Sequence, residues 1–264
     1  MKTLDCYIDG IGLTGPGLND WPAARAIFKG QAAYLNEKTV APSPAALPAA
    51  ERRRCGPLVK LSIAVGHEAA AAAGIAVATL PTVFSASGGD GDNCHEICAM
   101  LASDDRQISP TRFHNSVHNA ASGYWSIATG AMAPSSVLCA FDGSFGAGLL
   151  EAVTQAVVDD TCVLLIACDT PYPEPLHGVR NIADAFGVGL VIAPRRSARS
   201  LARMTLALTA GPSDVMADSM LEAVRKNIPA ARSLPLLRAV AQGEAGSLVL
   251  DYLDRVRLCI TLQD

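Results

Sequence analysis

Two reactive side chains, Cys139 and Asp142, lie close together in the segment SSVLCAFDGSFGAGLLEA, residues 135–152. The segment is typical of a short apolar strand that passes through a turn of small residues into an alanine- and leucine-rich helix. Free N–H groups and the positive end of the dipole at a helix N-terminus stabilise an anion at such a turn. Cys139 falls within the strand, so its sulfur is expected to point into the core, whereas Asp142 occupies the turn itself.

Asp142 is poorly suited to acyl transfer, because the mixed anhydride that a carboxylate would form is far more labile than a thioester. The position instead predicts a buried acceptor for the N–H groups of the helix. Hydrogen bonds to a charged group stabilise by roughly 1.5 to 3 kcal/mol each. No catalytic residue is therefore predicted at the turn, and Cys139 is the alternative nucleophile.

Two further groups of residues resemble metal ligands. HNSVHN, residues 114–119, has histidines at i and i+4, and CHEIC, residues 94–98, brings two thiols and an imidazole nearby. However, no glutamate follows the first histidine as in HExxH, and CHEIC presents only two of its groups on one helix face. No metal site is predicted, and His118 and Asn119 are expected to be hydrogen-bonding residues of a loop or helix start.

Two glycine-containing loops resemble catalytic motifs only superficially. SGGDGDN, residues 87–93, lies between a strand and a helix but matches neither GxGxxG nor GxxxxGK[ST]. DGSFG, residues 142–146, begins with aspartate, unlike GxSxG, and no histidine lies beyond His177 to complete a triad. No cofactor is predicted.

The elements that position these residues alternate between strand and helix. Strands are predicted at residues 4–13, 82–85, 137–140 and 162–168, separated by helices that include 58–73, 119–132 and 146–158. Asn19 or Asp20 and Asp92 or Asn93 are expected helix caps. Such alternation predicts a layered α/β fold with parallel strands.

The other segments are less regular. Residues 41–54, APSPAALPAAERRR, are predicted to be a proline-broken loop. Beyond residue 186, 187–193 and 202–211 resemble paired strands, 214–225 and 246–255 resemble helices, and 257–262 resembles a last strand. Nothing resembling a linker divides the chain, so one domain is expected over residues 1–264.

Composition narrows the function. The 264 residues are 50% hydrophobic with a net charge of -4, which is typical of a soluble globular protein and argues against a nucleic-acid surface. Asp5 and Asp9 interrupt any secretory signal, and no apolar run reaches the ~20 residues of a membrane span, so a cytoplasmic protein is expected. Most of the eight cysteines lie in apolar, strand-like contexts and are expected to be reduced and buried.

Four segments in order resemble the β-ketoacyl synthases of the thiolase superfamily. SVLCAFD aligns without a gap with YTISTAC of that family, which places Asp142 on the catalytic cysteine. The alanine-rich helix behind it, the N-terminal DGIGLTGPGLNDWPAARAIFKG and the later FHNSVHNAASGYWSIATG are also similar. The match covers about residues 4–193, whereas 195–264 resemble a divergent extension. The resemblance implies a half-thiolase-like fold, the N-terminal half of a ketosynthase, with a layered mixed sheet flanked by helices.

The same segments also resemble a short subgroup of this family, the chain length factors found with aryl-polyene and related polyene synthesis genes. Chain length factors also lack the cysteine and often carry glutamine, so aspartate departs from their commonest pattern. The family's two catalytic histidines come from a second half-domain, and no histidine of this chain can be assigned to them. The resemblance therefore implies a non-catalytic subunit that pairs with a full-length ketosynthase. That partner would condense acyl chains delivered by an acyl carrier protein.

The resemblance also implies which surfaces meet the partner. Family dimers join their sheets near the strand before the nucleophile, which points to residues 137–140 and the helix from Asn119. Tyr124 and Trp125 project about 100° apart on that helix, so one of them is expected at the interface. Three residues beside the turn are either core or the wall of the partner's acyl tunnel, namely Phe141, Phe145 and Leu149.

Two other functions remain open from the sequence. One is an autonomous small thioesterase or acyltransferase that uses Cys139 or Asp142, with His118 as a candidate base. The other is a homodimeric binding protein with no role in acyl transfer. Neighbouring genes for a ketosynthase and a carrier protein would favour the subunit.

Overall fold

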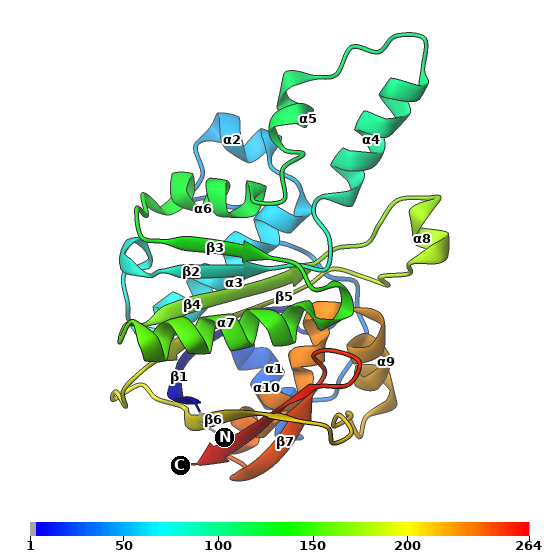
Figure 1. Ribbon diagram of the computed structural model, residues 1–264. Helices are drawn as coiled ribbons and strands as arrows, with labels where there is room; N and C mark the ends of the chain where they lie inside the picture. The colour runs from blue at the N-terminus through cyan, green and yellow to red at the C-terminus, as the bar shows by residue number, and fades with distance from the viewer. Residues whose placement is uncertain (1–3, 264) are drawn as a thin grey trace.

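Eight strands form one sheet in the order β3-β2-β4-β5-β1-β6-β8-β7, in a computed structural model that describes residues 4–263 (Figure 1). The strands are β1 (Leu4–Thr14), β2 (Thr82–Ser85), β3 (Ser135–Leu138), β4 (Val163–Asp169), β5 (Phe186–Ala193), β6 (Ala202–Thr209), β7 (Gly246–Leu250) and β8 (Arg257–Gln263). The helices are α1 (Trp21–Phe28), α2 (Ala49–Arg54), α3 (Pro57–Ala73), α4 (Gly91–Ala102), α5 (Pro110–His114), α6 (Ala120–Thr129), α7 (Ser144–Val158), α8 (Leu176–Val179), α9 (Ser219–Asn227) and α10 (Leu234–Gln242).

The sheet is mixed, which confirms the layered mixed fold and corrects the expectation of parallel strands. β2 pairs in parallel with β3 and β4, but β5 lies antiparallel between β4 and β1. The strands predicted as a pair, β5 and β6, lie on opposite sides of β1 instead. The reason is the connection from β4 to β5, which returns antiparallel without the crossover helix that parallel pairing requires.

Two helical layers cover the two faces of the sheet. Every residue of β4 is buried, because alternate side chains face α7 on one side and α3 on the other. Leu165 packs in the core with Phe145 and Leu149 of α7. Leu164 packs in the opposite core with Trp125 of α6. A continuous apolar strand such as CVLLIAC is typical of this doubly covered position.

Local signals explain most helix ends. The Asp20 carboxylate accepts a hydrogen bond from the N–H of Ala23 at 2.8 Å and caps α1, and Gly74 ends α3 in the left-handed conformation at φ 68°. The cap of α4 is Asp90 rather than Asp92 or Asn93, because the Asp90 carboxylate accepts from the third N–H after it.

Three predicted elements were wrong. Residues 49–54 form α2, because Pro48 precedes the helix rather than interrupting it. Residues 246–250 form β7 and not a helix, since their backbone pairs with β8. The helix expected at 214–225 begins only at Ser219, where the carboxylate of Asp218 caps it, and α10 was not predicted at all.

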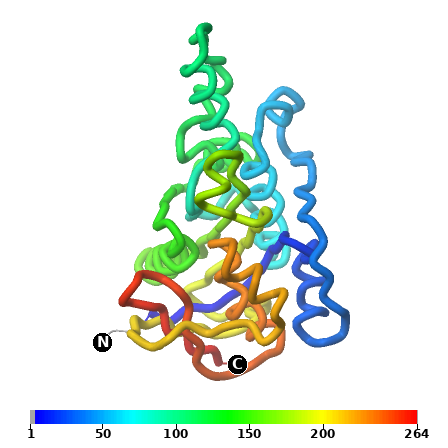
Figure 2. Tube along the Cα trace, turned by 90° about the vertical axis from the view of Figure 1, so that its right-hand side faces the viewer, coloured from blue at the N-terminus to red at the C-terminus, as the bar shows by residue number. Residues whose placement is uncertain are grey.

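The chain between Gly91 and His118, called the arm below, projects from the body of the molecule. Both views show α4 and α5 reaching away from the sheet beyond β2 and β3 (Figures 1 and 2). At the opposite side, β6, β8 and β7 extend the same sheet. Within residues 4–263, no helix has the length and apolar character needed to cross a membrane.

Candidate functional site

The turn between β3 and α7 departs from ordinary backbone geometry at Phe141. β3 ends at Leu138, and a single 3-10 turn (Phe141–Gly143) leads into α7. Phe141 has a φ of 51°, in the left-handed region that residues with a β-carbon rarely adopt, and it is 61% exposed. Such a conformation costs on the order of 1 to 3 kcal/mol, so contacts around the turn must hold it.

Buried contacts hold the inner side of the turn. The hydroxyl of Ser144 accepts a hydrogen bond from the N–H of Ala140 at 3.0 Å and donates one to the carbonyl of Phe141 at 2.6 Å. Gly143 and Gly146 let the loop after β7 lie against the start of α7. A β-carbon at either glycine would collide with a backbone carbonyl of that loop.

Asp142 lies between two arginines. Its Oδ1 accepts from Nη2 of Arg180 at 2.9 Å, and its Oδ2 lies 3.2 Å from Nη2 of Arg232. The Asp142 side chain is 40% exposed. The expectation of a buried acceptor for helix N–H groups was therefore wrong, because cations from distant segments neutralise the carboxylate instead. A carboxylate held this way is an ion-pair partner and not a free nucleophile.

Arg180 joins the two unusual residues of the turn. Its guanidinium carbon lies 3.7 Å from the centroid of the Phe141 ring while the same group binds Asp142. A stacked arginine stabilises by roughly 0.5 to 1 kcal/mol at an exposed site and more when desolvated. The Arg180 side chain is only 17% exposed, so its charge depends on Asp142 for compensation.

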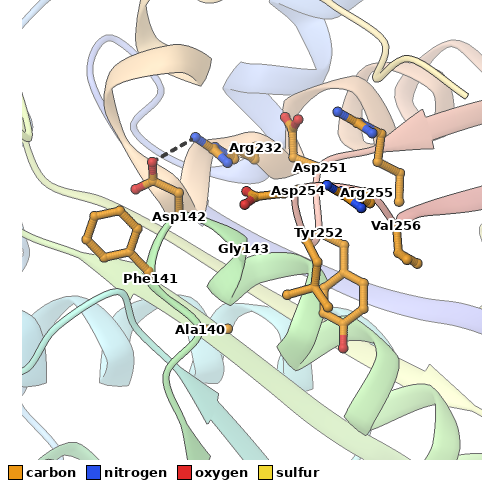
Figure 3. Close-up of a pocket in the computed structure, with 12 residues that line it drawn as sticks. Ala140, Phe141, Asp142, Gly143, Arg232, Asp251, Tyr252, Asp254, Arg255 and Val256 are labelled. Carbon is orange, nitrogen blue, oxygen red and sulfur yellow. Dashed lines mark ion pairs between the residues drawn. The ribbon is translucent and has the colours of Figure 1, made fainter. Parts of the chain in front are cut away.

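A cleft of about 670 Å³ opens beside Asp142 (Figure 3). One side is the turn from Ala140 to Gly143, and the other is the loop between β7 and β8, residues 251–256, with the first residue of β8, while Arg232 lies between them. Figure 3 shows the Asp142–Arg232 ion pair at one end and Tyr252 at the other. The lining carries charges of both signs, which gives no strong preference for an anion or a cation.

A buried ion-pair network fixes the far wall of this cleft. Arg225 donates to Glu222 at 2.7 and 2.8 Å and to Asp251 at 2.6 Å, and its side chain is 8% exposed. Hydrogen bonds from Arg225 lower the pKa of Glu222 to about 2. Asp251 also accepts from the hydroxyl of Ser213 at 2.7 Å. The cleft therefore has rigid walls.

Cys139 is exposed rather than buried, which corrects the expectation from the sequence. β3 ends one residue earlier, so the side chain belongs to the turn and its Sγ donates to the carbonyl of Ser87 at 3.2 Å. In the described chain no hydrogen bond joins Cys139 to a histidine. Among the other strand cysteines, Cys6 and Cys168 are buried, and burial raises the pKa of each thiol to about 12.

A buried carboxyl group lies beneath the turn. Asp169, at the end of β4, is 3% exposed and accepts from the N–H groups of Ser87 and Ala230, each at 2.8 Å. Burial raises the pKa of Asp169 to about 6, although both hydrogen bonds oppose the shift. Asp169 thereby links β4, the loop after β2 and the segment before α10.

The aromatic residues proposed for the tunnel or interface are mostly core. Phe145 and Leu149 are fully buried under the sheet. Tyr124 and Trp125 are 3% and 1% exposed, so the expectation that one of them lies on the surface was wrong. α6 is covered on two sides, because the Tyr124 hydroxyl donates to Asn115 at 3.0 Å while Trp125 packs toward α3.

A second, apolar hollow lies at the base of the arm. Its volume is about 390 Å³, and it lies between α4, the end of the arm and the chain before α8. Its lining includes Cys94, Cys98, His118, Tyr172 and Leu176. We call it the apolar hollow. His118 and Asn119 are exposed, and the carbonyl of Asn119 accepts from Ser122 in the first turn of α6.

The histidines and cysteines of the arm do not form a metal centre. Residues 4–263 contain no group of three or more histidine, cysteine, aspartate or glutamate side chains arranged to hold a metal ion. Cys94 is on the wall of the apolar hollow, where partial burial and the neighbouring Cys98 raise the pKa of its thiol. Both cysteines are part of the wall of the apolar hollow.

Sequence reasoning found the turn but missed its partners. Arg180 and Arg232 carry no motif and come from different segments beyond β4, so only the fold brings them to Asp142. Tyr172 and Leu176 were likewise not predicted to line a hollow. Their sequence, PYPEPL, reads as an ordinary proline-rich loop.

Comparison with known proteins identifies a family and a fold. The family model described as "Beta-ketoacyl synthase, N-terminal domain" matches residues 27–250. No curated protein matches the sequence. The matched residues include 195–250, which the sequence resemblance had left out as a divergent extension, but they do not include residues 4–26.

Solved structures share the fold over nearly the whole chain. The first is a ketosynthase (ApeO) in complex with its chain length factor (ApeC) from Xenorhabdus doucetiae, with a TM-score of 0.74 and 21% identity over 98% of this chain and 99% of that chain. The second is the AntDE:AntF complex, a type II PKS acyl-carrier protein in complex with its ketosynthase bound to the hexaketide. Its TM-score is 0.74, with 12% identity over 99% of this chain and 99% of that chain. The ishigamide ketosynthase/chain length factor has a TM-score of 0.66, with 14% identity over 97% of this chain and 98% of that chain. These matches show the thiolase-type fold of ketosynthase halves.

Proposed function

Because this chain belongs to the β-ketoacyl synthase N-terminal domain family, we propose that it is a non-catalytic subunit of the chain-length-factor type that pairs with a full-length ketosynthase. The observation that carries the proposal is the state of the turn before α7. Where the family has its cysteine, this chain has Asp142, and Arg180 and Arg232 bind both carboxylate oxygens. In this proposal the partner performs the condensation and receives the acyl chain from a carrier protein.

The pathway proposed is polyene or fatty-acid-like biosynthesis of the aryl-polyene type. The segments that resemble short chain length factors support it, as does the shared fold with the ApeO–ApeC complex. We propose that all 264 residues act as one domain. β6, β8 and β7 support this, since they continue the same sheet as the strands around the turn.

The proposed interface is the open edge of the sheet at β3 with the adjoining face of α6. β3 pairs only with β2, so its outer edge presents unpaired backbone groups within the described sheet. Beside it, Ile127 and Met132 are 49% and 94% exposed. An open strand edge flanked by exposed apolar side chains is typical of a surface that pairs with the sheet of another protein.

The proposed acyl path runs past the apolar hollow and the Phe141 turn. The hollow offers about 390 Å³ of apolar space, and His118 lies on its wall. Phe145, Leu149, Tyr124 and Trp125 would support this path from the core rather than line it. Length control would then depend on the arm and the chain before α8.

One competing function is an autonomous thioesterase or acyltransferase, which would use the exposed thiol of Cys139 as its nucleophile. An activated thiolate needs a base or a cation beside the sulfur. The hydrogen bond of Cys139 instead places its S–H against a carbonyl acceptor. In the described chain the sulfur thus contacts a carbonyl oxygen and not a base or a cation, which supports the subunit role.

Co-expression with a ketosynthase encoded beside this gene, followed by size-exclusion chromatography with light scattering, tests the proposal. We expect a 1:1 complex that Met132→Glu and Ile127→Glu weaken. Leu208→Glu is the matched control, since Leu208 is also exposed, at 46%, but lies on β6, which four strands separate from β3. Two proteins that elute separately at micromolar concentration would overturn the proposal.

A further inference from the structure

The chain from residue 171 to residue 181, called the α8 segment, is held loosely. None of its residues is buried, and Leu176 and Val179 are 45% and 84% exposed. Its backbone hydrogen bonds are local, from the N–H groups of His177 and Arg180 to carbonyls within the segment. Packing therefore contributes little to holding the segment in one position.

Two side chains tie the α8 segment to the body. Tyr172 lies so close to Gly88 and Gly91 that a β-carbon at either glycine would collide with its ring or hydroxyl. Arg180 binds Asp142 at 2.9 Å and stacks on Phe141. Within residues 4–263, the α8 segment makes one side-chain hydrogen bond and ion pair to a residue outside the segment, which is the Arg180–Asp142 contact.

The same segment forms a wall of the apolar hollow. Tyr172, Pro173 and Leu176 line the hollow opposite Cys94 and Cys98 of α4. The position of that wall depends on where the segment is anchored at its two ends. Asp142 holds the end that carries Arg180.

We infer that Asp142 is a positioning residue for the apolar hollow. The carboxylate at the former nucleophile position anchors Arg180, and Arg180 sets the α8 segment that walls the hollow. As a factor in acyl chain length, this inference rests on the proposed function. The anchoring itself can be measured on the chain alone.

Hydrogen exchange followed by mass spectrometry tests the anchor. In Asp142→Ala, exchange of the hydrogen-bonded amides of the α8 segment, those of His177 and Arg180, is expected to rise about tenfold, while the exchange of β4 and β5 stays unchanged. Sodium acetate should restore slow exchange in Asp142→Ala, because a free carboxylate can bind between Arg180 and Arg232. Acetate should not restore Arg180→Gln, which lacks the cation. Asp142→Asn, which keeps the size of the side chain, should loosen the same segment.

The matched control is Asp5→Ala. Asp5 also accepts from an arginine and a second donor, Arg203 at 3.2 Å and Thr205 at 2.6 Å, but lies on β1 away from the hollow. Loss of the Asp5 carboxylate should leave amide exchange across the α8 segment unchanged. Unchanged exchange in folded Asp142→Ala and Asp142→Asn would overturn the anchor, as would loosening that acetate does not reverse.

The consequence for chain length is measured in the complex with the ketosynthase. Asp142→Ala should shift the distribution of product lengths, and acetate should shift it back, while Asp5→Ala leaves it unchanged. If the wild-type complex forms and the variant has normal product lengths, this inference fails and the proposed function stands. If wild-type chain and ketosynthase do not associate, the proposed function fails, and hydrogen exchange still decides the anchor.

Discussion

The turn at Asp142 lines the cleft and the α8 segment lines the apolar hollow, and Arg180 joins the two, yet the walls of the two sites are held in opposite ways. The far wall of the cleft is tied by Arg225 to two carboxylates, and the buried Asp169 links three segments beneath the turn. The hollow is walled by an arm that projects from the body and by a segment with no buried residue. The difference separates a charged site held by ion pairs from an apolar space whose shape can vary.

The largest expected effect is on the rigid side. Arg225→Ala leaves Glu222 and Asp251 without their shared cation in a largely buried site, so we expect a loss of about 3 to 5 kcal/mol in the free energy of unfolding. Urea denaturation measures it. The control is Arg203→Ala, whose ion pair with Asp5 is exposed and worth at most about 1 kcal/mol. Equal losses in the two variants would mean that the Arg225 network stabilises the cleft wall no more than an exposed ion pair would.

Asp169 predicts how stability depends on pH. Its pKa is raised to about 6 in the folded state, so the folded chain holds a proton there that the unfolded chain releases near 3.8. The free energy of unfolding should therefore fall as pH rises from about 4.5 to 6, by up to about 2 kcal/mol. Below that window Glu222 acts oppositely, because its low pKa removes stability as pH falls.

Urea unfolding at several pH values, with wild type and Asp169→Asn, separates these contributions. The slope between pH 4.5 and 6 should become shallower in Asp169→Asn, and the slope that remains belongs to groups such as Glu68 and Asp90, whose pKa values burial also raises. A slope equal to that of the wild type would assign the pH dependence to those groups.

A smaller effect is expected at the hollow. Leu176→Ala removes a side chain that is 45% exposed, so the free energy of unfolding should fall by less than about 1 kcal/mol. Urea denaturation again provides the measurement, with Leu149→Ala as the buried comparison at about 2 to 5 kcal/mol. A loss above about 2 kcal/mol for Leu176→Ala would mean that the hollow is as tightly packed as the core.

The smallest expected effect concerns Cys139. With its S–H donated to the Ser87 carbonyl, the thiol should react with iodoacetamide at pH 7 no faster than a small-molecule thiol. Peptide mapping by mass spectrometry distinguishes it from Cys94 and Cys98. A rate more than about tenfold above that reference would indicate an activated thiolate and favour the autonomous enzyme.

Local patterns predicted the elements around the turn. The apolar run of β4, the alanine-rich α7 and the glycine that ends α3 specify their structures through neighbouring residues, and the fold class followed from them. Strand orientation was not predictable this way, because β5 and β1 pair through residues that lie far apart in the chain. β7 was mistaken for a helix, since its strand pairing with β8 exists only in the folded sheet.

The candidate site divides along the same line. The turn was located because strand, small residues and helix follow one another in the sequence. The partners of Asp142 were not, since Arg180 and Arg232 reach it from α8 and the segment before α10. The burial of both Tyr124 and Trp125 also required the fold, which covers two faces of α6.

The most direct test of a non-catalytic subunit is a condensation assay on the complex in which each chain is disabled in turn. One complex carries Cys139→Ala and Asp142→Ala in this chain, and the other carries an alanine in place of the partner's nucleophilic cysteine. The account predicts that condensation survives the first change, with altered product length, and is lost with the second. Condensation that survives loss of the partner's cysteine, but not the loss of Cys139 and Asp142, would contradict it.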